Sequence, residues 1–152
     1  MHIRKAKIED YNEIIKLYNE LYDTEKVFDI NLSKNYDVSD KQRIKIEKRI
    51  KSRKEIFLVA EDNEKIIGLI DGYILDNNHH IEKVGYLDHL CVNKKYRNLG
   101  VANKLIDEFS IRMKNKNVCY LKLNAFEKNI PAINLYKKLG FEEYSILYLK
   151  KI

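Results

Sequence analysis

The stretch KKYRNLGVANKL, residues Lys94 to Leu105, follows the apolar run YLDHLCV and places one of only five glycines directly before an amphipathic segment. From Val101 to Lys114, apolar residues recur at helical spacing. The first amides of a helix have no partner within it and carry partial positive charge, which suits phosphate groups. Gly100 can adopt a positive φ, so these amides can curl towards a pyrophosphate, and Arg97 adds a positive charge. One glycine before a helix is also ordinary turn chemistry, so the surrounding sequence has to decide.

The rest of the chain alternates between strand and helix patterns. Strands are expected over residues 2–10, 56–62, 65–75, 84–92, 118–126 and 141–151. Helices are expected after Asp10 as N-cap, over the basic run 40–55 and over 131–139, where Gly140 supplies the C-terminal cap. Strands joined by short turns pair antiparallel, whereas strands joined through a helix are usually parallel. The order therefore predicts an α+β fold with a mixed sheet and helices on both faces.

Length and composition restrict the class of protein. A chain of 152 residues without repeats or proline-rich linkers is the usual size of one domain, expected here over residues 1–152. No apolar run is long enough for a membrane helix and no signal peptide is visible, so we expect a cytoplasmic protein without membrane contact. A net charge of +6 could favour binding to the phosphates of a nucleic acid. Positive charge is concentrated only in residues 40–55. This segment fits a solvated helix face better than a nucleic-acid site, because no nucleic-acid motif accompanies it.

The two cysteines do not indicate a metal or a disulfide. Cys91 and Cys119 lie in expected strands and lack a second CxxC pair or metal-ligand spacing, so buried thiols are expected. The NNHH run at residues 77–80 is interpreted as an exposed turn, because no further ligands stand at coordinating spacing. No metal is predicted.

The strand, the RxxGxA turn and the helix resemble, in this order, the GNAT superfamily of acyl-CoA-dependent N-acetyltransferases, whose signature is Q/R-x-x-G-x-G/A. The positions matching the signature are Arg97, Asn98, Leu99, Gly100, Val101 and Ala102. Alanine at position 102 replaces the second glycine of many members and limits how closely the backbone can approach the phosphates. Further along, NIPAINLYKKLGF resembles the second conserved segment of the family. Its matching residues are Asn129, Ala132, Leu135, Tyr136, Gly140 and Phe141.

The resemblance implies the GNAT arrangement, a mostly antiparallel sheet of six to seven strands that splays apart between strands 4 and 5. It also implies acetyl-CoA as co-substrate, with its pantetheine arm along the fourth strand. The residues implied to bind it are Leu90, Cys91, Val92, Arg97, Asn98, Leu99, Gly100, Val101, Ala102, Asn103, Asn129 and Tyr136. Cys91 needs no chemical role, because transfer in this family is typically direct. Asn129 can also act as a helix cap.

Direct transfer requires an amine that has lost its proton. Asp88 is the first candidate to accept it, since it stands two residues before Leu90 and should share its face of the strand. The run YLDHLCVNKKYRNLGVA also resembles diamine and polyamine acetyltransferases, where an acidic residue holds this place. His89 is a rival base, expected on the opposite face. Tyr136 is the candidate that protonates the departing thiolate, although its spacing alone would make it a core aromatic.

The resemblance therefore predicts an N-acetyltransferase that acts on a primary amine of a small molecule or a peptide. A diamine or polyamine leads, while aminoglycosides and protein N-termini stay open. Tyr86, Tyr73 and Asp71 are expected to line the acceptor pocket. The acids that could make it negative are Asp23, Glu25, Asp29, Asp37 and Asp71. A non-catalytic acyl-CoA sensor on the same fold is the alternative, and a homodimer is compatible with the family.

Overall fold

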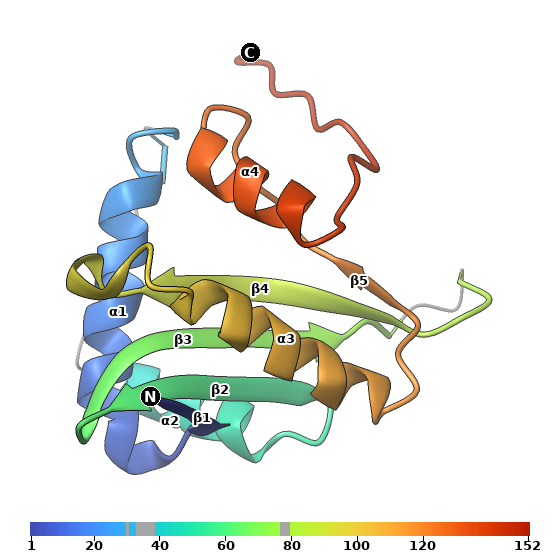
Figure 1. Ribbon diagram of the computed structural model, residues 1–152. Coiled ribbons are helices and arrows are strands. Elements are labelled where there is room, and N and C mark those ends of the chain that lie inside the picture. Colours follow the sequence, from blue (N-terminus) through green and yellow to red (C-terminus); the bar gives the residue numbers. More distant parts are fainter. Residues whose placement is uncertain (30, 33–38, 77–79) are drawn as a thin grey trace.

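The computed structural model describes residues 1–29, 31–32, 39–76 and 80–152 and holds five strands and four α-helices (Figure 1). The strands are β1 (His2–Lys5), β2 (Glu55–Asp62), β3 (Lys65–Ile74), β4 (Val84–Val92) and β5 (Tyr120–Lys122). The α-helices are α1 (Tyr11–Glu25), α2 (Asp40–Lys51), α3 (Val101–Lys114) and α4 (Ile130–Lys138). Two short 3-10 turns, Ile8–Asp10 and Lys94–Tyr96, precede α1 and α3.

All five strands form one sheet in the order β1-β2-β3-β4-β5. The first four strands pair antiparallel, and β5 pairs parallel to β4 because α3 carries the chain back between them. The expected α+β class and the mixed, mostly antiparallel sheet are therefore confirmed. The described residues contain five strands rather than six to seven.

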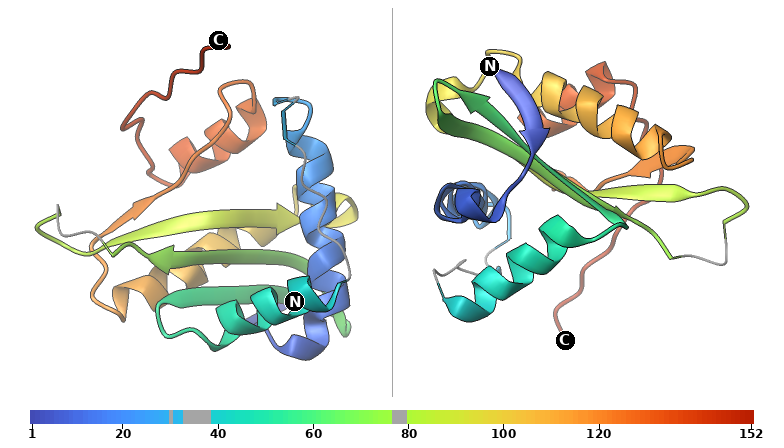
Figure 2. Two further views of the ribbon diagram at one scale, coloured as in Figure 1. Left: turned by 180° about the vertical axis from the view of Figure 1, so that it is seen from behind. Right: turned by 90° about the horizontal axis from the view of Figure 1, so that it is seen from below.

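Helices cover both faces of the sheet, as expected (Figure 2). One hydrophobic cluster joins α1 and α2 to one face and includes Tyr18, Ile46 and Phe57. A second cluster joins α3 to the other face and includes Ile70 and Phe109. Within the described residues, no helix is long and apolar enough to cross a membrane.

The strand predicted over residues 141–151 does not form. Residues 142–152 lie outside any helix or strand and are exposed. Their alternating pattern favours a strand, but a strand needs a neighbour for its backbone groups, and no strand of the described residues pairs with this segment. The strand predicted over 118–126 shortens to β5 for the same reason, since β4 accompanies it only over Tyr120–Lys122.

Three smaller predictions also change. Asp10 stands before α1 but does not cap it, because its carboxylate accepts from the Lys7 backbone amide and from Arg4. Cys119 is exposed rather than buried, since it precedes the shortened β5. Three residues of the predicted NNHH turn, 77–79, and the acid Asp37 lie outside the described residues.

Candidate active site

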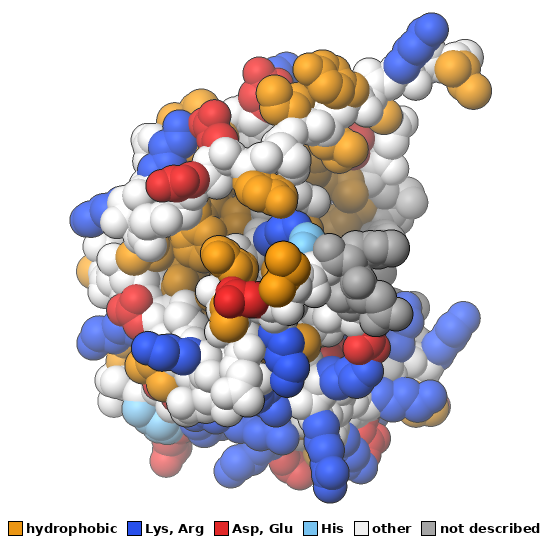
Figure 3. Space-filling model, turned by 90° about the vertical axis from the view of Figure 1, so that its right-hand side faces the viewer, with side chains coloured by type: hydrophobic (Ala, Val, Ile, Leu, Met, Phe, Trp, Pro, Cys, Tyr) orange, Lys and Arg blue, Asp and Glu red, His pale blue; other side chains and the backbone are white. Residues whose placement is uncertain are grey.

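The sheet opens between β4 and β5. The two strands pair only where Val84, Gly85 and Tyr86 face β5, so the rest of β4 has no strand on that side among the residues that the structure describes. The splay expected between strands 4 and 5 is therefore confirmed. Leu90, Val92 and Tyr136 pack against the same apolar cluster, which brings α4 over the open part of β4. From the side, the surface is hollowed at mid-height, and hydrophobic side chains line the hollow (Figure 3).

The turn after β4 ends with free backbone amides. Asn98 and Gly100 both adopt positive φ angles, 61° and 76°, and a Cβ on Gly100 would meet nothing within 4 Å. Gly100 is the N-cap of α3 and provides no side-chain cap. The amides of Val101, Ala102 and Asn103 have no partner among the described residues, whereas the Lys104 amide donates to the Gly100 carbonyl. This geometry fits an anion at the start of α3.

Arg97 lies at the entrance of this turn. Its Nε donates to the carbonyl of Val92, the last residue of β4, at 3.1 Å. The guanidinium therefore lies beside the carboxyl end of β4. A pantetheine arm along β4 would end near this positive charge.

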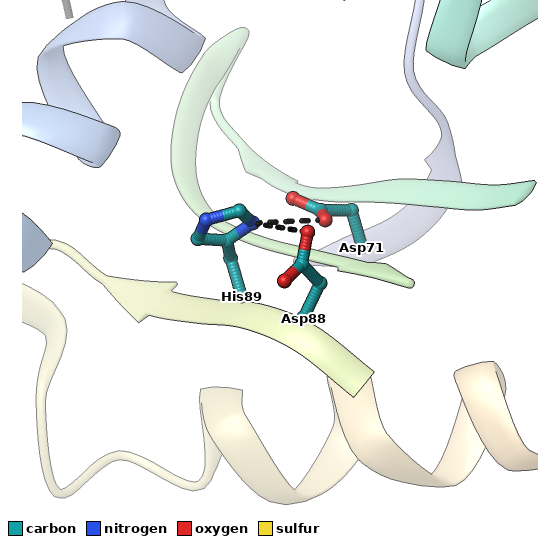
Figure 4. A group of neighbouring side chains, drawn as sticks. All are labelled: Asp71, Asp88 and His89. Atoms are coloured by element: carbon teal, nitrogen blue, oxygen red, sulfur yellow. Dashed lines mark hydrogen bonds and ion pairs between the residues drawn. The ribbon is translucent and has the colours of Figure 1, made fainter. Parts of the chain in front are cut away.

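A bulge in β4 changes the faces predicted for Asp88 and His89. Asp71 pairs with His89 and Gly72 with Leu87, so Asp88 is the extra residue between them. His89 Nδ1 lies 3.0 Å from an oxygen of Asp71 and 3.3 Å from an oxygen of Asp88 (Figure 4). The expectation that Asp88 and His89 face opposite sides is therefore wrong, because the sequence does not reveal the bulge.

Asp71 is the buried centre of a polar network. Its carboxylate accepts from the Tyr18 hydroxyl, from Arg49 at 2.6 Å and from His89. Burial by itself would raise the pKa of Asp71, but the attraction of His89 and Arg49 holds it below its ordinary value. Burial would lower the pKa of His89, but Asp71 and Asp88 raise it above its ordinary value, which favours the imidazolium.

Arg49 is a site residue that sequence reasoning missed. Its guanidinium also contacts Asp88 at 3.1 Å and Glu55 at 2.6 Å. Asp71, Asp88 and His89 bring possible metal ligands within 4.8 Å of one another, yet this guanidinium already supplies a positive charge to both aspartates. The sequence could have indicated this inward position, because Arg49 lies three residues after Ile46 and next to Ile50, the two residues that α2 buries.

Glu25 and Tyr136 approach the same site from α1 and α4. Burial raises the pKa of Glu25, the Asp88 charge raises it further, and His89 opposes this. Burial and the charge of Glu25 raise the pKa of Tyr136 to about 12. The Glu25 carboxylate has no hydrogen bond or ion pair with another described residue, in contrast to Asp71 and Asp88. The structure thus brings a partly buried, unpaired carboxylate and a protonated phenol near β4.

The other predicted site residues lie in different places around β4. Tyr73 on β3 and Tyr86 on β4 lie across from each other with tilted rings whose centroids are 5.5 Å apart, and burial and the charge of Asp88 raise the pKa of both. Cys91 instead points away from the opening, donating to the Leu17 carbonyl at 3.0 Å, and burial raises its pKa to about 12. It is the packed thiol that was expected. The side chain of Asn129 accepts from the Ala132 amide and caps α4.

The remaining acids do not all join the site. Asp23 is fully exposed and pairs with Lys26. Asp29 accepts from the Asn31 amide in the segment after α1. Just before it, Phe28 stacks on Phe126 at 5.9 Å, which joins the end of α1 to the loop that leads into α4. Of the four acids among the described residues, Glu25 and Asp71 are the ones that the structure brings to β4.

Comparison with known proteins identifies this architecture. Residues 13–141 match the model of the acetyltransferase (GNAT) family, and the chain belongs to that family. An N-alpha-acetyltransferase of Sulfurisphaera tokodaii is 30% identical over 95% of this chain and 82% of its own length.

Solved structures share the fold at lower identity. A variant of a Bacillus halodurans protein has a TM-score of 0.89 and 19% identity, and the match covers 100% of both chains. An aminoglycoside acetyltransferase from a soil metagenomic sample, in complex with sisomicin, has a TM-score of 0.75 and 19% identity over 99% of this chain and 95% of its own.

Proposed function

We propose that this acetyltransferase moves an acetyl group from acetyl-CoA to the α-amino group of a polypeptide. The observation that carries the proposal is the open edge of β4, which leads from the Glu25–Tyr136 pair to the free amides of α3. Acetyl-CoA supplies an activated thioester when it is bound. The chain's own residues have to bind acetyl-CoA, orient the amine, accept the proton that the amine loses and donate a proton to the departing sulfur.

The cofactor is held mainly by backbone groups. The edge of β4 at Leu90, Cys91 and Val92 pairs with the pantetheine amides as an added strand would. The turn from Arg97 to Asn103 receives the diphosphate on its amides, with the Arg97 charge beside it. Asn129 caps α4 and helps to hold the loop that faces the cofactor.

The incoming amine meets Asp88 and Glu25. Asp88 attracts the ammonium group, but Arg49 and His89 already compensate its charge. Glu25 is the better proton acceptor, because it is unpaired and burial raises its pKa above the ordinary value. Asp88 then orients the amine, in place of the proton transfer predicted for it from the sequence.

Tyr136 serves the departing sulfur. A phenol whose pKa is raised to about 12 stays protonated at neutral pH, so it can donate a proton or hydrogen bond but cannot act as a base. Its place on α4, against the same apolar cluster as Leu90 and Val92, supports this role.

A polypeptide α-amine fits this site better than a diamine does. The α-amino group has a pKa of about 8, against about 10.4 for an alkyl amine, so its deprotonation at neutral pH costs less free energy. The Arg49 and His89 charges also reduce the negative potential that a dication would need. The N-alpha-acetyltransferase from Sulfurisphaera tokodaii, by its name, supports the same acceptor class.

An acceptor panel tests the proposal. Thiol release from acetyl-CoA is measured with unmodified peptides, the same peptides with blocked α-amines, spermidine and an aminoglycoside. The expected result is turnover with free peptide N-termini and at least tenfold lower kcat/KM for the other acceptors. Preference for spermidine would support the diamine reading, and acetyl-CoA binding without turnover on any amine would support a non-catalytic sensor.

Gly100→Val tests the anion-binding turn. Valine at a φ of 76° is strained, and its side chain would crowd the anion, so we expect the Kd for acetyl-CoA to rise at least about tenfold. Titration calorimetry measures this value. Gly140→Val is the matched control, because Gly140 also has a positive φ, 85°, and nothing within 4 Å. Equal losses of affinity in both variants, or none in Gly100→Val, would contradict the assignment.

A further inference from the structure

The carboxylate of Asp88 is held at one oxygen and left open at the other. Its Oδ2 lies 3.1 Å from Nη2 of Arg49 and 3.3 Å from Nδ1 of His89. Its Oδ1 has no hydrogen bond or ion pair with another residue that the structure describes. The side chain of Asp88 is 32% exposed. One oxygen is therefore fixed, and the other is available to an acceptor.

The held oxygen belongs to a closed ring of four contacts. Oδ1 of the buried Asp71 lies 2.6 Å from the same Nη2 of Arg49 and 3.0 Å from the same Nδ1 of His89. One guanidinium nitrogen and one imidazole nitrogen therefore each join both carboxylates, and Figure 4 shows His89 turned towards the two aspartates. This ring resists rotation of Asp88, because turning its carboxylate would break two contacts at once.

Arg49 is itself fixed by its surroundings. Its Nε donates to Glu55 at 2.6 Å, and its central carbon lies 5.9 Å from the centre of the Phe57 ring. The side chain of Asp71, its other strong partner, is only 1% exposed. A guanidinium is planar and fork-shaped, so it can donate to Glu55, Asp71 and Asp88 in one orientation.

We propose that Arg49 is a positioning residue, which holds one oxygen of Asp88 so that the other receives an N–H of the acceptor amine. Arg49 does not contact the amine itself. The inference rests on the proposed function, in which Asp88 orients the amine and Glu25 accepts its proton. A fixed oxygen meets the amine with its geometry already set, whereas a rotating carboxylate must first be ordered, which weakens binding.

Arg49→Lys tests the positioning role, because it keeps the charge of the site and removes the fork. A single ammonium cannot donate to three carboxylates in the same way. The buried Asp71 loses most when it is left unpaired, so Asp88 is the partner that should be released. We expect KM for the amine to rise at least about fivefold, while kcat and the Kd for acetyl-CoA change less than about twofold. Steady-state kinetics with a peptide acceptor and titration calorimetry measure these values.

A double-mutant cycle with Asp88→Asn separates positioning from general structural support. Arg49 acts through Asp88, so Arg49→Lys should change KM less than about twofold when Asp88→Asn is already present. Arg43→Lys is the matched control and should keep the parent KM. Arg43 belongs to the same helix, is exposed and lies over the Tyr11 ring at 5.4 Å. An equal rise in KM in both backgrounds, or no rise in either, would overturn the proposal.

A crystal structure of Arg49→Lys gives a readout that does not depend on the acceptor. The introduced ammonium is expected within about 4 Å of the Asp71 carboxylate, with the Asp88 carboxylate turned out of the ring. An Asp88 carboxylate that keeps its place would contradict the positioning role. If the parent enzyme acetylates another amine of the panel but no peptide, the proposed function fails, and the same kinetic comparison with that amine still tests Arg49. Absence of turnover on every amine would overturn both.

Discussion

Tyr136→Phe is expected to lower kcat about 100-fold or more while changing the Kd for acetyl-CoA less than about twofold. The substitution removes only the phenolic oxygen, and the ring keeps its edge-to-face contact with Phe141 at 5.8 Å. If the hydroxyl protonates the leaving sulfur, its loss affects the chemical step and spares cofactor binding. Steady-state kinetics and titration calorimetry on the same preparation separate the two.

Tyr120→Phe is the control for this experiment. Tyr120 is 62% exposed on β5 and should be silent in both measurements. If Tyr136→Phe keeps the parent kcat, the proton-donor role is wrong and Tyr136 is a packing residue, as its helical spacing alone suggests.

Glu25→Gln is expected to lower kcat/KM about 100-fold and to remove the acid limb of its pH profile. The sign follows from the raised pKa of Glu25: the base must be ionised, so activity in the parent rises as the pH passes upward through that pKa. Glutamine keeps the shape of the side chain but cannot take a proton. Rates are measured from pH 5 to 9 with a peptide acceptor.

Asp23→Asn is the matched control, because Asp23 is an acid of the same helix that is fully exposed and pairs with Lys26. It should reproduce the parent profile. Asp88→Asn should instead raise KM for the amine while keeping the acid limb. An acid limb that persists in Glu25→Gln and disappears in Asp88→Asn would return the proton transfer to Asp88.

Local patterns predicted the parts of this site that depend on local geometry. The start of α3 at Val101 and the bounds of β4 follow from the apolar run and the glycine that separate them. The positive φ of Gly100 was predictable because few other residues tolerate it. The parallel β4–β5 pair was predictable from the helix between the two strands.

Features that depend on distant partners were not predictable in the same way. The bulge at Asp88 arises from the pairing of β3 with β4, and it turns Asp88 towards His89. Arg49 looked like one more charge in a basic run, and only the buried Asp71 across from it reveals its role. Residues 141–151 have a strand pattern, but no described strand pairs with them. Periodicity indicates an extended backbone, and it does not indicate which strand would pair with it.

We propose that the amides at the start of α3 bind the diphosphate of acetyl-CoA, and the assignment of the site depends on this contact. A crystal structure with coenzyme A tests it most directly. Phosphate oxygens are expected about 2.7–3.2 Å from the amide nitrogens of Val101, Ala102 or Asn103, and the pantetheine arm is expected along Leu90–Val92. A diphosphate bound elsewhere, with these amides facing only solvent, would contradict it.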